Sequence, residues 1–115
     1  MAVFSAVFTP AQASGGIEDN QQVINLATTT ASSTLTIGVR SIIAISVQNG
    51  TTTGAVLGAC VRFSKGSSTA ASTDFNVPLN TIITLDLGDA FDSVSFYNPN
   101  GTGTLTINVM RLSRT

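Results

Sequence analysis

The feature that most constrains this fold is the alternation of apolar and polar residues at every second position. It is clearest in the stretch from Thr34 to Val39, TLTIGV, where the second, fourth and sixth residues are apolar. Because successive side chains of a β-strand point to opposite faces of the sheet, this pattern predicts a strand with one buried face. The alternation recurs at five further places, whose inward residues are Ile43, Ile45 and Val47; Leu57, Ala59, Val61 and Phe63; Ile83, Leu85 and Leu87; Val94 and Phe96; and Leu105, Ile107 and Val109.

Weaker signals add strands at 3–8 and 23–28 and a short edge piece at 73–77, before Pro78. No stretch keeps the spacing of an amphipathic helix, so we expect little or no helix. Turn sequences such as Gln48-Asn49-Gly50 separate the strands and are expected to join antiparallel neighbours. The sequence therefore predicts an all-β protein, an antiparallel β-sandwich of about eight strands with jelly-roll or other Greek-key topology.

The chain length sets the domain organisation. A sequence of 115 residues has room for one core, so residues 1–115 are expected to form a single β-sandwich domain. Residues 1–20 are open to two interpretations. They either belong to the sandwich as a first strand or leave it as an extended arm that contacts a partner.

Several classes of function are excluded by composition. Only 10% of the residues are charged and the net charge is −1, so no strong field attracts a nucleic acid. No apolar run approaches the roughly 20 residues of a membrane-spanning helix. The absence of histidine and the single cysteine, Cys60, exclude a Ser-His-Asp triad, a Cys-His pair, a histidine metal site and an internal disulfide. We therefore expect no enzyme, no cofactor and no small-molecule substrate, and a Cys60 that is either covered and inert or close to a contact surface.

One acidic stretch is a metal candidate. Asp86, Asp89 and Asp92 offer oxygen ligands of the kind that Ca²⁺ prefers. Their spacing is not that of an EF-hand loop, however, and three Asp across a strand end and its turn are more typical of side chains that cap the backbone. The expectation is therefore no metal, with these three residues as the only candidates.

The polar surface indicates a protein that contacts other subunits. Thirteen serines and 17 threonines replace most of the charge that a soluble domain usually carries, about 25% of residues. Either other subunits cover much of the exterior, or threonine-rich outer faces are solvated through their hydroxyls. Seven apolar residues on the outward phase or in the first segment are interface candidates: Phe4, Phe8, Ile42, Val56, Ile82, Met110 and Leu112. The alternative for these is a core with two apolar sides.

In length, charge poverty and segments such as Asn100-Gly101-Thr102-Gly103-Thr104-Leu105-Thr106-Ile107, the whole chain resembles the small jelly-roll decoration, or cement, proteins of tailed-bacteriophage capsids. The resemblance implies a non-enzymatic virion protein that stabilises the capsid by bridging subunits of the major capsid protein. It also implies a homo-oligomer, a dimer or a trimer, made in the host cytoplasm and located on the outer capsid surface. No signature residue accompanies it, so no individual role transfers to this chain.

Two other functions are compatible with a small sandwich. A carbohydrate- or receptor-binding module of a virion fibre or spike usually exposes Trp or Tyr, and this chain has no Trp and one Tyr. A small hydrolase needs two convergent carboxylates in a cleft. Fold alone distinguishes none of these functions.

Overall fold

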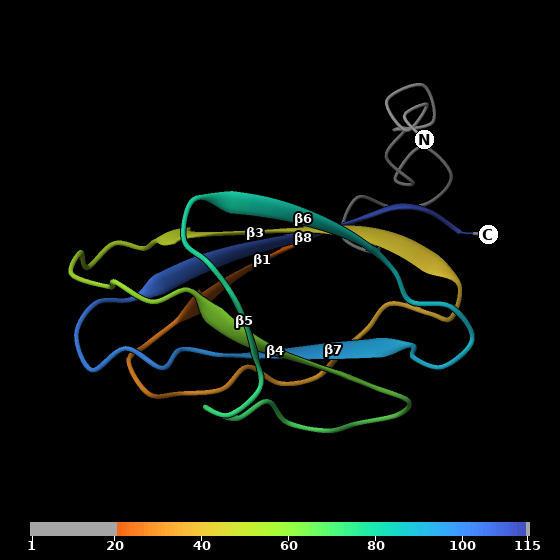
Figure 1. Cartoon of the computed structure of the whole chain (residues 1–115), viewed down its shortest axis with the longest axis horizontal. Helices are drawn as coiled ribbons and strands as arrows, with labels where there is room; N and C mark the ends of the chain where they lie inside the picture. The colour runs from red at the N-terminus through yellow and green to blue at the C-terminus, as the bar shows by residue number, and fades with distance from the viewer. Residues whose placement is uncertain (1–20, 115) are drawn as a thin grey trace.

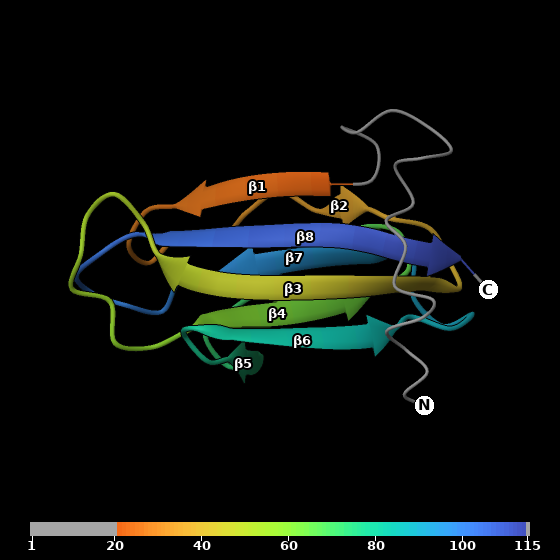
Figure 2. The same cartoon turned by 90° about the horizontal axis from the view of Figure 1, so that it is seen from above.

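Eight strands form two four-stranded antiparallel sheets in the computed structural model, which describes residues 21–114 (Figure 1). The strands are β1 (Gln21–Leu26), β2 (Leu35–Thr36), β3 (Ser41–Asn49), β4 (Ala59–Ser64), β5 (Phe75–Val77), β6 (Thr81–Asp86), β7 (Ser93–Tyr97) and β8 (Leu105–Arg114). The first sheet has the order β1-β8-β3-β6 and the second the order β2-β7-β4-β5. Figure 2 shows the first sheet lying over the second, which confirms the predicted all-β sandwich.

The strand pairing is nested along the chain. β1 pairs with β8, β2 with β7, β3 with β6 and β4 with β5, and β3 and β4 also pair with β8 and β7. A chain folded back on itself at β4–β5 and then rolled into two sheets is a jelly roll. Of the two topologies that the sequence predicts, the structure therefore has the jelly roll.

This topology corrects the prediction for the turns. The Asn49-Gly50 turn does not join antiparallel neighbours, because β3 and β4 lie in opposite sheets. The same holds for the turns before β7 and β8. In a jelly roll most connections cross from one sheet to the other, and turn residues look the same in either case.

The core lies between the sheets and is built from the predicted inward residues. Ile43, Ile45 and Val47 of β3 are each 0% exposed, while the side chains between them are half-buried. β8 contributes Leu105, Ile107 and Val109 in the same way, and Phe96 of β7 fills the opposite side. Burial in these strands therefore follows the alternation of apolar and polar residues in the sequence.

Two predicted strand positions differ from the structure. The strand predicted at 34–39 is reduced to the two residues of β2, because Gly38 and Arg40 have φ values of 111° and 58° and turn the chain. Leu57, predicted to face inward on β4, precedes the strand and is 50% exposed. The predicted segment at 3–8 lies outside the described residues.

A β-bulge reverses the orientation predicted for Leu112. Across β3 and β8, Ile43 is paired with Arg111 but Ile42 is paired with Ser113, so Leu112 is an extra residue. Inserting one residue moves the following side chains to the other face of the strand. Leu112 is consequently buried, at 2% exposed, and the prediction that it faces outward is wrong.

The bulge predicts opposite effects for two apolar residues of β8. Leu112→Ala is expected to lower the free energy of unfolding by about 2–4 kcal/mol, because it removes a buried side chain. Met110→Ala, at a half-buried position on the outer face, is expected to cost no more than about 1 kcal/mol. Urea denaturation of both variants measures the difference. A larger loss for Met110→Ala than for Leu112→Ala would show that the bulge is absent.

Candidate interaction surface

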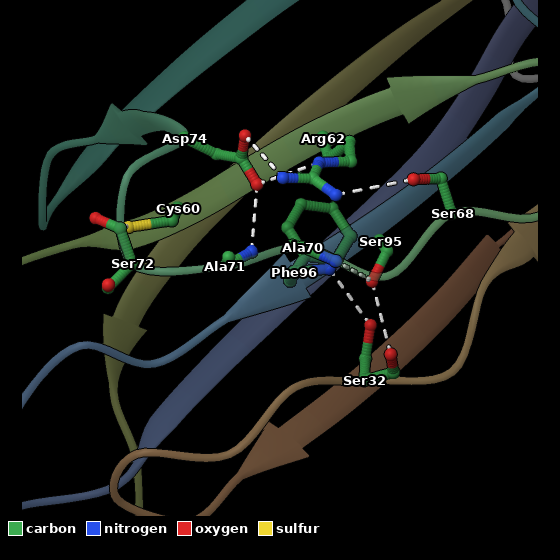
Figure 3. Close-up of polar contacts among 10 residues, drawn as sticks. All are labelled: Ser32, Cys60, Arg62, Ser68, Ala70, Ala71, Ser72, Asp74, Ser95 and Phe96. Carbon is green, nitrogen blue, oxygen red and sulfur yellow. Dashed lines mark hydrogen bonds and ion pairs between the residues drawn. The ribbon is translucent and has the colours of Figure 1, made fainter.

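The outer face of the second sheet is covered by the chain itself. Ser93 and Ser95 of β7 alternate with inward-facing neighbours, yet both are 0% exposed. The Ser95 hydroxyl accepts a hydrogen bond from Ala70 N at 3.0 Å and donates one to Ser32 O at 3.1 Å (Figure 3). Two loops, 27–34 and 65–74, thus lie across this sheet and bond to the buried Ser95 hydroxyl.

An ion pair fixes the second of these loops. Arg62 Nε of β4 lies 3.0 Å from Asp74 Oδ2, and Arg62 Nη1 donates to Ser68 Oγ at 3.3 Å (Figure 3). The Ala71 N–H, at 2.7 Å, and the Arg62 guanidinium lower the pKa of the Asp74 carboxyl. Cys60 lies under the same loop and is 2% exposed, so it is covered rather than near a contact surface.

The outer face of the first sheet is different, because no segment of the described chain crosses it (Figure 1). We call it the bare face. Its side chains come from all four strands. Val23 of β1 (54% exposed) and Ile82 of β6 (74% exposed) lie on its two edge strands. Strand pairing places these two residues in one row across the sheet, in the order Val23, Asn108, Ser46, Ile82. The bare face comprises Val23, Asn25, Ile42, Ala44, Ser46, Gln48, Ile82, Thr84, Asp86, Thr106, Asn108 and Met110.

Polar side chains of the bare face bond to one another. Thr106 Oγ1 donates to Asn25 Oδ1 at 2.9 Å, and Asn108 Nδ2 donates to Ser46 Oγ at 3.4 Å. Asp86, at the end of the edge strand β6, is the one charged residue in the set. The surface is thus flat, nearly neutral and mixed apolar and polar, like the core of a protein–protein interface, where charged residues are depleted.

The predicted interface residues are only partly brought together. Ile42, Ile82 and Met110 share the bare face, whereas Val56, 81% exposed, lies in the loop between β3 and β4. Leu112 is buried, and Phe4 and Phe8 lie outside the described residues. Sequence reasoning missed Val23, Leu57, Phe75 and Phe91 as exposed apolar residues. Val23 was detectable, because it alternates with Ile24 and Leu26.

The β3–β4 loop is held in place by one buried side chain. Asn100 is 4% exposed, and its Oδ1 accepts hydrogen bonds from Val56 N at 3.0 Å and Leu57 N at 2.8 Å. Its Nδ2 donates to Leu57 O at 2.8 Å. Three backbone groups of the tip are therefore fixed from below, while the Val56 and Leu57 side chains point outward and are 81% and 50% exposed.

A second asparagine supports the first. Asn98 is fully buried, donates through Nδ2 to Leu26 O and Gly103 O, and accepts from Asn100 N at 2.9 Å. Gly103 has a φ of 93°, and a Cβ there would lie 2.3 Å from Ala55 N. The sequence identifies 98–101 as a turn, but the buried partners are far apart in sequence and carry no local signal.

The three candidate metal ligands do not converge. Asp86 Oδ1 accepts a hydrogen bond from Gly88 N at 2.9 Å, which is backbone capping within its own turn. Asp89 forms an exposed ion pair with Arg40, at 3.7 Å. Among the described residues no group of three or more His, Cys, Asp or Glu is placed to hold a metal ion.

Asp92 has partners of its own. Its Oδ1 accepts from Ser93 Oγ at 2.7 Å and from Gly66 N at 3.0 Å, and these bonds lower the pKa of the carboxyl. The carboxylate thereby ties the start of the 65–74 loop to β7. Its role in the described structure is that of a capping residue.

Comparison with known proteins gives no family. No family model matches the chain, and no curated protein does. One solved structure, from work on the disulfide-linked pili that form Bacillus endospore appendages, aligns with 82% of this chain and 87% of its own at 19% identity and a TM-score of 0.43. A similarity of that size carries no functional information. Within the described residues, no helix has the length and apolar character needed to cross a membrane.

The hydrogen bonds of Asn100 to the β3–β4 loop, which we call the asparagine clamp, predict a specific effect on stability. Asn100→Ala is expected to lower the free energy of unfolding by about 2–4 kcal/mol, because three backbone groups lose their partner and Asn98 Oδ1 loses one of its two donors. Asn108→Ala, on the bare face, removes one long hydrogen bond and is expected to cost less than about 1 kcal/mol. Urea denaturation compares the two variants, and equal losses would contradict the clamp.

The ion pair predicts a pH dependence. The folded-state pKa of Asp74 is lowered from 3.8, so its stabilisation is present above that value and is lost as the pH falls through the lowered one. Stability of the native protein is therefore expected to decline as the pH falls below about 4, and Asp74→Asn is expected to reduce the slope. Thermal unfolding across this range measures it. A slope that is the same in both proteins would contradict the role of Asp74.

Proposed function

We propose that the protein is a non-enzymatic structural protein of a virion, which decorates the outside of a tailed-phage capsid and stabilises it by bridging subunits of the major capsid protein. The capsid as the partner follows from the resemblance in length, charge and composition. The contact itself is argued from the surface of the molecule.

The observation that carries the proposal is the difference between the two outer faces. Loops 27–34 and 65–74 cover one sheet with hydrogen bonds to its buried Ser95, whereas within residues 21–114 nothing covers the other. The bare face also exposes Ile82 and Val23 and carries one charge at its margin. A flat surface with this composition can be buried against protein without desolvating charges, a step that is costly when they are unpaired.

The proposed mechanism is thermodynamic linkage. A protein that binds across two neighbouring subunits of an assembled shell, and not to the free subunits, stabilises the assembled state in proportion to its occupancy. A β-sandwich suits this role because its close-packed core deforms little under load. The loops of the second sheet then face away from the shell.

The proposal predicts the effect of a charge on the bare face. Ile82→Glu places a carboxylate at the 74%-exposed position, where the core is not disturbed, and is expected to weaken binding to assembled capsids at least tenfold. Phe75→Glu, 67% exposed on β5 of the other sheet, is the matched control and is expected to bind like the native protein. Co-sedimentation with assembled capsids and with free major capsid protein measures both.

Three results would overturn the proposal. They are a native protein that does not sediment with capsids, equal binding by capsids and free subunits, and an Ile82→Glu variant that binds as tightly as Phe75→Glu.

A further inference from the structure

An apolar pocket opens at the edge of the sandwich between β4 and β6. β5 pairs only with Ala59, Cys60 and Val61, so the rest of β4 has no neighbouring strand on that side in the described chain. The pocket has a volume of about 180 Å³ and is lined by Phe63, Leu85, Asp86, Leu87 and Phe91. It lies where β4 and β6 end.

The lining defines what the pocket accepts. The Phe63 and Phe91 rings are 5.9 Å apart at an interplanar angle of 40°, and Phe91 is 40% exposed at the opening. An apolar cavity of about 150 Å³ accommodates a benzene molecule. The pocket therefore has room for one or two aliphatic side chains, and its acidic rim residue Asp86 disfavours another anion.

An exposed apolar loop tip lies at the opposite end of the molecule. Val56 and Leu57 are 81% and 50% exposed at the tip of the 50–58 loop, which has no charged residue. The Asn100 clamp fixes the backbone of this tip, so docking requires little further ordering. β4 begins directly after the tip and ends beside the pocket, which places the two features at opposite ends of the long axis (Figure 2).

We propose that Val56 and Leu57 of one copy dock into the Phe63–Leu85–Leu87–Phe91 pocket of a second copy, so that the protein associates head to tail. The two contact surfaces are different, so the interface is heterologous, and each added copy leaves a free tip and a free pocket. Association therefore produces either a closed ring or an open chain of copies. Asp86, at the rim of the pocket and the margin of the bare face, is the one bare-face residue beside this contact, and the contact does not require the capsid.

A contact of this size is weak between free molecules. One inserted tip buries far less surface than the standard protein interface of about 1,600 Å². Copies held side by side on a larger assembly have a high effective concentration, which favours even a weak contact. In solution the association is therefore expected at high protein concentration only.

The test is complementation between two defective copies of the full chain. Val56→Asp places a carboxylate on the apolar tip, and Phe91→Asp places one at the opening of the pocket. Both side chains are exposed enough to be changed without unfolding the core. Each variant alone is expected to self-associate at least tenfold more weakly than the native protein in sedimentation equilibrium up to about 1 mM. Mixed together, they are expected to form a one-to-one dimer and nothing larger, because one intact tip meets one intact pocket.

The control is Thr69→Asp, an exposed residue of the 65–74 loop outside both surfaces, which is expected to associate like the native chain. Circular dichroism checks that every variant is folded. The proposal is wrong if the native protein is monomeric at the highest concentration or if the mixture gives no dimer. It is also wrong if Phe91→Asp abolishes association while Val56→Asp does not, since the pocket then binds something other than the tip.

Discussion

Burial of one face of each strand between two sheets is the constraint on which the rest of this structure depends. The eight strands are paired in nested order, so the apolar side of every strand reaches the same core, with residues such as Ile45 and Phe96 fully buried. This arrangement leaves two outer faces that the core does not determine. The chain covers one of them with its own loops, and in the described residues the other is left bare.

Neutral side chains form many of the buried hydrogen bonds in the described residues. Serine hydroxyls join the loops to the second sheet, and the amides of Asn98 and Asn100 hold three connections together at one end. Neutral partners avoid the desolvation cost of buried charges. A chain with 10% charged residues can therefore have ordered loops and still present neutral surfaces to partners.

The fold was largely predictable from sequence because alternation directly reports burial in strands such as β3 and β8. The exceptions have physical reasons. The burial of Leu112 depends on a bulge that arises where β8 pairs with β3. Leu57 is held outside the sandwich by Asn100, 43 residues away. The candidate site was predictable in part: Ile82 and Val56 are exposed as expected, but the pocket depends on where β5 ends, which no local pattern indicates.

Side-chain radical footprinting of the protein, free and bound to assembled capsids, tests whether it binds through the bare face. Oxidation of Ile82, Val23 and Met110 is expected to fall in the bound state, while Phe75 on the second sheet is oxidised equally in both. Protection of Phe75 with unchanged oxidation of Ile82 and Met110 would contradict binding through the bare face, because the protein would then bind through its other sheet.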